Sequence, residues 1–198
     1  MKRSDLGKIN LTPNFIGSWI IEPSLCDAII TYYEKNLQKQ YQGETLGGLN
    51  LETKNRRDIS LTPKELSLPE NEAYGIYFES LFECYKDYNI QWPFLARMVS
   101  HLDIGKFSIG KYIPGQHFQK IHCERDGLNS LHRLLAFITY LNDVEEGGST
   151  YFNHYDLEIK PKKGLTIIWP AEWTHAHKGN IVNTGLKYII TGWLSFSK

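Results

Sequence analysis

The alternation of apolar and polar residues divides the chain into a first part with helical periodicity and a second part of short strands. An apolar stretch over residues 15–21 predicts a strand, and an apolar stripe at helical spacing predicts a helix that begins at Pro23. Ser24, with Asp27 three residues later, has the form of a capping box at the start of this helix. A second stripe, mostly aromatic, predicts another helix over residues 70–87. Both helices are expected to pack on the outside of a sheet.

Short apolar runs separated by turn residues dominate the chain from residue 103 onward. Helices followed by strands predict an α+β protein, a β-barrel or sandwich buttressed by helices. At 198 residues the chain suits one domain, with helical support over about 23–88 and a β core over about 103–196. The predicted strands are 103–112, 118–123, 132–141, 149–152, 157–159, 165–169, 174–178 and 187–196.

The segment between the two predicted helices is polar and rich in glycine and asparagine. Residues 42–57 therefore predict a long loop. A loop of this kind in a compact domain is often a lid or a binding loop, and an ordinary surface loop is an equal alternative. Arg56 and Arg57 at its end could reach a substrate, although a solvated pair of arginines is the simpler expectation.

Charge and cysteine content narrow the class of protein. The 22 basic and 22 acidic residues balance and form no basic stripe, so a nucleic-acid partner is not expected. Three cysteines, an odd number without short spacing, argue against a disulfide framework and for a reducing compartment. Met1–Asp5 lacks an apolar signal core, and no run reaches membrane-spanning length. These features predict a cytoplasmic protein without a membrane partner.

A histidine and a carboxylate two residues apart give the first chemical signal. Residues two apart in an extended strand point to the same face, so His122 and Glu124 are expected to project side by side. Asp126 shares that face in an extended strand and is a second candidate carboxylate, although Asp126-Gly127 has the sequence of a turn. This pair alone is a weak signal, because such triplets also occur by chance.

Two further histidines lie about fifty residues later. His175 and His177 share a face of the predicted strand 174–178. Two histidines and one carboxylate on one face, with the other positions open, form the ligand set of oxygen-activating non-haem Fe(II). The sequence therefore predicts an iron site, with either histidine as its distal ligand.

Five short motifs occur along the second half of the chain in a fixed order. They are Tyr112-Ile113-Pro114-Gly115 ten residues before His122, Thr139–Asp143, Gly147–Phe152, Pro161–Gly164, and Gly185–Tyr188 leading into Thr191-Gly192-Trp193. In these motifs the chain resembles the Fe(II)/2-oxoglutarate-dependent dioxygenases, specifically their prolyl 4-hydroxylase-like branch, whose fold is a double-stranded β-helix, a jelly-roll or cupin-like barrel. The resemblance covers the chain from about residue 17 to its end, and five motifs in register make it specific.

The proposed metal ligands depart from the branch in one respect and agree with it in another. Most of the branch carries His-x-Asp, whereas this chain has His-x-Glu, which supplies the same anionic oxygen one methylene further out. In relatives the iron-binding histidine precedes the basic residue of the co-substrate site by nine or ten positions. His177 lies ten positions before Lys187 and His175 lies twelve, so the resemblance favours His177 and leaves His175 as the second candidate.

The resemblance also implies roles for residues around the iron. Lys187 would pair with the distal carboxylate of 2-oxoglutarate, and Tyr140 and Thr191 would donate hydrogen bonds to it. Tyr112 and Trp193 would form walls of the same cavity.

A substrate contact is also implied, by position alone. Arg133 lies seven residues before Tyr140 and is a candidate to touch the substrate, with a surface arginine as an equal alternative.

The implied activity is that of an Fe(II)- and 2-oxoglutarate-dependent dioxygenase. It would hydroxylate an unactivated C–H bond with O2, with ascorbate as a candidate reductant, while 2-oxoglutarate is decarboxylated to succinate. Peptidyl proline is the leading candidate substrate, and a small molecule or another side chain is the alternative. A non-catalytic metal- or ligand-binding module and a cupin-like metal hydrolase are alternatives on similar folds.

Overall fold

The computed structural model describes residues 14–45 and 47–197 and contains two antiparallel β-sheets with helices on one side. The N-terminal segment Met1–Asp5, predicted to lack a signal core, lies outside the described residues. Within the described chain, no helix combines the length and the apolar character needed to cross a membrane.

The larger sheet has eight strands and runs through the middle of the molecule. Its central strand, β12, pairs with β7 and β5 on its two sides and with β4 near its end. The strands in order across the sheet are β1 (Gly17–Ile20), β10 (Leu165–Pro170), β7 (Arg133–Tyr140), β12 (Lys187–Phe196), β5 (Phe107–Tyr112), β3 (Arg57–Leu61) and β2 (Tyr41–Gln42), with β4 (Leu102–Ile104) beside β12.

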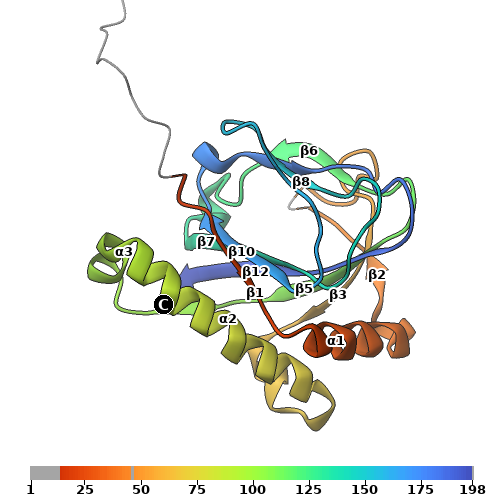
Figure 1. Ribbon diagram of the computed structural model, residues 1–198, viewed down its shortest axis with the longest axis horizontal. Coiled ribbons are helices and arrows are strands. Elements are labelled where there is room, and N and C mark those ends of the chain that lie inside the picture. Colours follow the sequence, from red (N-terminus) through yellow and green to blue (C-terminus); the bar gives the residue numbers. More distant parts are fainter. Residues whose placement is uncertain (1–13, 46, 198) are drawn as a thin grey trace, which may run out of the picture.

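The smaller sheet lies opposite the inner face of the larger one (Figure 1). Its strands in order are β6 (Phe118–His122), β11 (His177–Gly179), β8 (Thr150–Phe152) and β9 (Leu157–Ile159). From β5 onward the chain passes back and forth between the two sheets, with β8 and β9 as consecutive strands of the smaller one, which is the connectivity of a jelly roll. The predicted double-stranded β-helix is confirmed.

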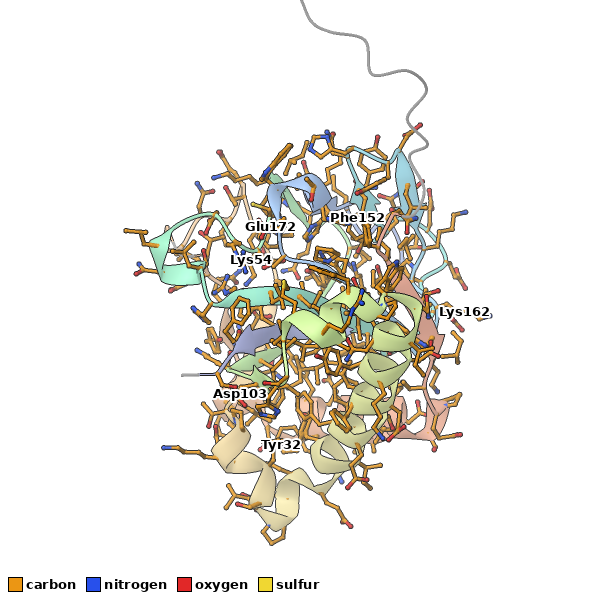
Figure 2. All side chains as sticks on the ribbon, turned by 90° about the vertical axis from the view of Figure 1, so that its left-hand side faces the viewer. Tyr32, Lys54, Asp103, Phe152, Lys162 and Glu172 are labelled. Carbon is orange, nitrogen blue, oxygen red and sulfur yellow. The ribbon has the colours of Figure 1, made fainter. Side chains whose placement is uncertain are left out.

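Three α-helices cover the outer face of the larger sheet (Figure 1). They are α1 (Pro23–Lys35), α2 (Glu72–Gln91) and α3 (Pro93–Met98), and short 3-10 helices occur at Leu37–Lys39, Pro63–Ser67, Pro69–Asn71, Leu128–Ser130 and Trp173–His175. In Figure 2, Tyr32 lies in the half of the molecule that holds the helices, whereas Lys54, Phe152 and Glu172 lie in the other half, with the smaller sheet.

Strand alternation on the larger sheet creates two cores. On β12, Tyr188 and Ile190 belong to the cluster that packs against the helices. Ile189, one residue between them, belongs to the second cluster, which lies between the two sheets with residues such as Phe152 and Trp169. Period-two alternation thus gives β12 one apolar face toward the helices. Its other face points to the space between the two sheets, where polar side chains gather.

Two local expectations about this scaffold are wrong. Glu22, not Ser24, is the residue before the first helical position of α1, and its side chain makes no capping bond; Pro23 occupies the first turn. Proline needs no amide partner there, which explains a start without a capping box. The predicted strand 103–112 is interrupted at Gly105-Lys106 and forms β4 and β5.

Candidate active site

A cavity of about 700 Å³ lies between the two sheets. Its floor is the inner face of β12, β5 and β3, and β6 and β11 of the smaller sheet close it from the other side. The polar residues that line it include His122, Glu124, His177 and Lys187. Every site residue predicted from the sequence except His175 and Tyr140 lines this cavity.

Two histidines and one glutamate converge at one end of the cavity. One ligand atom from each of His122, Glu124 and His177 lies within 4.8 Å of the others. The Glu124 Oε1 atom is 3.5 Å from His177 Nε2 and 3.8 Å from His122 Nε2. The two histidines are direct partners across the β6–β11 pairing, so residues far apart in sequence meet here through strand register.

An irregularity in β6 aims His122 at this point. On β11, His177 and Gly179 are two residues apart. Their partners on β6, His122 and Phe118, are four residues apart. The extra residues between them bulge outward and are exposed, and the Phe118 ring stacks on the His122 ring at 3.9 Å and 15°. Bulges commonly redirect a side chain in this way beside active sites.

Backbone carbonyls fix the ring orientation of both histidines. His122 Nδ1 donates to the carbonyl oxygen of Lys120 at 2.8 Å, and His177 Nδ1 donates to that of His175 at 2.9 Å. With each Nδ1 held by a carbonyl oxygen, Nε2 is the ring nitrogen that faces the cavity in both residues. This is the arrangement found in metal-binding histidines, whose other nitrogen is held by an oxygen acceptor.

Glu124 is held as a carboxylate by its neighbours. Burial alone would raise its pKa, but the hydrogen bond with His177, the nearby His122 and the bond from Trp193 hold the pKa at about 2. Trp193 Nε1 donates to Oε2 at 2.6 Å, which leaves Oε1 facing the two histidines. Burial and the neighbouring His177 lower the pKa of His122 to about 4, so at neutral pH this imidazole is neutral beside the carboxylate.

Arg133 lies behind the carboxylate rather than apart from it. Its Nη1 donates to the backbone carbonyl oxygen of Glu124 at 2.9 Å, and its guanidinium stacks on the Trp193 indole at 3.6 Å. The side chain is half-buried, and its Nε makes no hydrogen bond within the described chain. Arg133 lines the cavity, but its Nε atom is itself buried.

The alternative ligands lie elsewhere. His175 belongs to a 3-10 helix, so it does not share a strand face with His177 as expected, and its Nε2 is 2.8 Å from the carbonyl oxygen of Asn14. Its backbone carbonyl, not its ring, serves the site. Asp126 accepts a hydrogen bond from Ser130 at 3.0 Å within a turn, as its sequence indicates, and does not join the cluster.

A buried lysine occupies the opposite, inner end of the cavity. Lys187 on β12 pairs with Tyr112 on β5, is only 2% exposed, and donates from Nζ to the carbonyl oxygen of Gly148. Its Nζ also lies 4.9 Å from the ring centre of Tyr112 and 5.6 Å from that of Tyr140. Burial and the charge of Arg56 lower the pKa of Lys187 to about 7. Within the described chain no carboxylate pairs with it.

The two hydroxyl donors expected beside Lys187 are already engaged. The Tyr140 hydroxyl donates to Thr150 Oγ1 at 2.6 Å, and the Thr191 hydroxyl donates to the carbonyl oxygen of Phe137 at 2.8 Å. Thr150 lines the cavity, and its own hydrogen is free to be donated there. Thr150, in the Gly-Gly-x-Thr motif, is therefore a site residue that sequence reasoning missed.

A second group that sequence reasoning missed surrounds Arg56. Arg57 is exposed as expected, but Arg56 is buried and pairs through Nε with Asp58 at 2.7 Å, so the expected solvated pair is wrong. Lys54 pairs with the other oxygen of Asp58 at 3.0 Å. The available signal was the alternation of Lys54, Arg56 and Asp58, which places all three on one strand face.

Comparison with known proteins gives a family match over part of the chain and a fold. A family model described as the 2OG-Fe(II) oxygenase superfamily matches residues 107–195. The chain is 29% identical over 91 residues to the chicken prolyl 4-hydroxylase subunit alpha-2, which covers 42% of this chain and 17% of that protein. It is 29% identical over 125 residues to the Arabidopsis thaliana probable prolyl 4-hydroxylase 9, covering 50% and 43%. The chain thus spans less than half the length of these two relatives.

Two solved structures have the same fold. The viral collagen prolyl hydroxylase of Paramecium bursaria Chlorella virus-1 in its 2OG complex superposes with a TM-score of 0.69 at 19% identity, over 92% of this chain and 97% of that one. A Pseudomonas putida prolyl-4-hydroxylase superposes with a TM-score of 0.72 at 14% identity, over 95% and 96%. At these identities the likeness establishes the fold.

Proposed function

We propose that this chain, which belongs to the prolyl 4-hydroxylase-like branch of the 2OG-Fe(II) oxygenase superfamily, is an Fe(II)- and 2-oxoglutarate-dependent hydroxylase. One observation carries the proposal: a His-Glu-His cluster and a buried lysine with no carboxylate partner in the described chain line one cavity. The lysine stands six residues along β12 from Trp193, which holds the glutamate. A dicarboxylate with a 2-oxo acid group at one end would chelate a metal at the His-Glu-His cluster and pair its other carboxylate with the lysine.

The donor set fits a divalent iron. Two imidazole nitrogens and one carboxylate oxygen converge, and both imidazoles have their Nδ1 proton committed to a backbone carbonyl. His122, Glu124 and His177 would hold the metal, with His177 rather than His175 as the distal ligand. Fe(II) bound there supplies the activation of dioxygen.

The inner end fits the distal carboxylate of 2-oxoglutarate. Lys187 supplies the positive charge, and the hydroxyls of Thr150 and Tyr112 supply hydrogen bonds. A buried ion pair needs such extra hydrogen bonds to be stable. The apolar residues between the two ends, Ile138 and Ile189, exclude water from the methylene groups of the co-substrate.

The substrate would enter from the open side of the cavity, beside Arg133. A guanidinium at the cavity wall suits an acceptor such as a peptide carbonyl. A solved prolyl hydroxylase from Trichoplax adhaerens is in complex with a hypoxia-inducible-factor oxygen degradation domain peptide fragment, at 14% identity to this chain. We propose a peptide substrate hydroxylated at proline. Ascorbate dependence and a cytoplasmic location stay predictions.

Succinate release tests the activity. Purified protein with Fe(II), 2-oxoglutarate and ascorbate is expected to release succinate, and proline-containing peptides are expected to increase the rate. His122→Ala and Glu124→Ala should each abolish release, while His101→Ala, which alters an exposed histidine that does not line the cavity, should not. Turnover that survives in both ligand variants would refute the metal assignment. Tight binding of 2-oxoglutarate without turnover across a broad substrate panel would favour a non-catalytic module.

A further inference from the structure

Three cations, Lys54, Arg56 and Lys187, and the carboxylate of Asp58 are buried along one wall of the cavity. Lys54, Arg56 and Lys187 are 8%, 5% and 2% exposed, and Asp58 is 1% exposed. Within the described chain, Asp58 is the only carboxylate in ion-pair contact with this group. Buried charge without a partner is strongly destabilising, so this excess of positive charge calls for an anion.

Strand register sets Arg56 beside the co-substrate end. Arg57, the first residue of β3, pairs with Lys111 on β5. Arg56 therefore comes next to Tyr112, whose other neighbour across the sheet is Lys187 on β12. The order across the sheet is lysine, tyrosine, arginine.

The contacts of Arg56 determine how the Tyr112 hydroxyl can bond. Arg56 Nη1 donates to the Tyr112 hydroxyl oxygen at 2.9 Å, while Nε is fixed by Asp58 at 2.7 Å. A phenol that accepts from a guanidinium keeps its own hydrogen for another acceptor. In the described part of the chain that hydrogen has no acceptor, and Tyr112 lines the cavity next to Lys187.

The Arg56 side chain lines the cavity, and its Nη1 and Nε atoms are committed to Tyr112 and Asp58. Its guanidinium lies 5.5 Å from the ring centre of Tyr112. The backbone of Gly110 supports the pair closely, because a Cβ atom there would lie 2.9 Å from Asp58 Oδ1 and 3.0 Å from Arg56 Nε. The Arg56–Asp58 pair is thus built into the sheet at a position that requires glycine opposite it.

We propose that Arg56 is a positioning residue for the dicarboxylate co-substrate: it turns the Tyr112 hydroxyl hydrogen toward the distal carboxylate and adds a second positive charge behind Lys187. This inference rests on the proposed function and assigns a role that Lys187 alone cannot fill. Asp58, which also pairs with Lys54, holds the guanidinium in place.

The charge of Arg56 also couples the site to pH. The groups that face Lys187 are Tyr112 from β5, Tyr140 from β7 and the Gly148 carbonyl, and Arg56 with Asp58 lies behind Tyr112. The carboxylate of the ligand binds the protonated lysine, so affinity falls as pH rises above the pKa of Lys187, which Arg56 lowers. Removal of the arginine charge must move this fall to higher pH.

Calorimetric binding of 2-oxoglutarate to Mn(II)-loaded protein, measured from pH 6 to 9, tests the proposal without turnover. Arg56→Gln is expected to weaken binding roughly tenfold, the loss of one charge-assisted hydrogen bond, and to move the pH-dependent fall upward by about half to one unit. The matched control Arg57→Gln alters the exposed neighbour and should change neither quantity. Arg56→Lys keeps the charge, so it should weaken binding without moving the pH dependence.

Tyr112→Phe keeps the test decisive if Arg56→Gln does not fold. It should weaken binding, though less than Arg56→Gln, which also removes a positive charge. The double variant should be no weaker than Arg56→Gln alone, because the hydrogen bond that Tyr112→Phe removes is already lost there. Additive losses, or an unchanged pH dependence in Arg56→Gln, would overturn the inference. Lys187→Met distinguishes failure of the proposed function from failure of the role of Arg56. If Lys187→Met leaves binding intact, as Arg56→Gln does, the proposed function fails. If Lys187→Met abolishes binding while Arg56→Gln leaves it intact, only the role of Arg56 fails.

Discussion

At the scale of single residues, the site depends on one indole nitrogen that orients the glutamate. Trp193 Nε1 holds Glu124 Oε2, so the longer side chain of glutamate is fixed with its other oxygen toward the histidines. This explains how a chain with His-x-Glu can present the same oxygen as one with His-x-Asp. Arg133 stabilises the indole from its other face.

Trp193→Phe is therefore predicted to weaken Fe(II) or Mn(II) binding by about 10- to 100-fold, the usual effect of removing a partner of a metal ligand. The ring that stacks on Arg133 is retained, so the fold should be preserved. Metal titration followed by calorimetry measures the effect. Trp173→Phe is the matched control, because Trp173 is 67% exposed; equal losses in both variants would contradict the assigned role.

Lys187 illustrates a conflict between stability and binding. Its pKa is lowered from 10.5 to about 7 in the folded protein, so between these values the unfolded chain binds more protons than the folded one. The contribution of Lys187 to stability therefore rises with pH from about 7 to about 10.5, by at most about 1.4 kcal/mol per pH unit.

Lys187→Met is expected to stabilise the ligand-free protein at pH 7 and below, and to abolish 2-oxoglutarate binding. Thermal unfolding of both proteins from pH 6 to 10 measures this, and the difference between them should shrink as pH rises. If the stability difference between the wild type and Lys187→Met is independent of pH, the pKa of Lys187 is not lowered in the folded protein.

Residue types and spacing identified most of these groups in advance. His122, Glu124, His177 and Lys187 follow from motifs whose order is fixed along the chain. The hydrogen-bond acceptors of the Thr191 and Tyr140 hydroxyls could not be predicted from the sequence. A hydroxyl can donate to a ligand or to the protein, and the folded structure decides which acceptor is in reach. Burial of Arg56 was missed for a similar reason: Asp58 neutralises it across one strand face.

At the scale of elements, the bulge in β6 decides where the first histidine points. The bulge brings Phe118 against His122 and supplies the Lys120 carbonyl that holds Nδ1. Phe118 is linked in turn to the 42–57 loop, since Lys54 Nζ lies 5.8 Å over its ring and Asn55 bridges to His117. The polar loop is thus tied to the strand that carries His122.

Phe118→Leu is predicted to lower metal affinity about tenfold, because the stacked ring that restricts His122 is lost while apolar volume is kept. The change should leave 2-oxoglutarate affinity per bound metal nearly unaltered, since Lys187 lies at the other end of the cavity. Calorimetry of each ligand separates the two effects. Ile121→Leu in the exposed bulge is the control, and an unaffected metal affinity in Phe118→Leu would argue against stacking as the constraint.

Elements were predicted best where periodicity was long. The two longer helices and β12 follow from their apolar stripes, whereas the predicted strand 174–178 is a 3-10 turn followed by β11. Short apolar runs do not distinguish these conformations. The bulge could not be foreseen, because the extra residues of β6 appear only against the register of β11.

At the scale of the whole molecule, helices and site lie on opposite faces of one sheet. Residues that alternate along β12 serve the two sides separately: Ile190 packs with the helices, and its neighbours Ile189 and Thr191 face the cavity. The helical layer therefore supports the sheet without touching the chemistry.

Ile190→Ala should accordingly lower the free energy of unfolding by about 2–5 kcal/mol, while metal and 2-oxoglutarate affinities stay within about twofold of wild type. Urea unfolding gives the first quantity and calorimetry the second. Ile113→Ala, at a 47% exposed position, should change stability by less than about 1 kcal/mol. A large loss of affinity in Ile190→Ala would show that the two faces of the sheet are not independent.

The visible charge-transfer absorption of Fe(II) chelated by a 2-oxo acid tests the central claim most directly. In anaerobic titrations, protein with Fe(II) and 2-oxoglutarate is predicted to develop this band, His175→Ala to retain it, and His177→Ala and Glu124→Ala to lose it. A band that persists in His177→Ala, or that disappears in His175→Ala while the protein stays folded, would contradict the iron site described here.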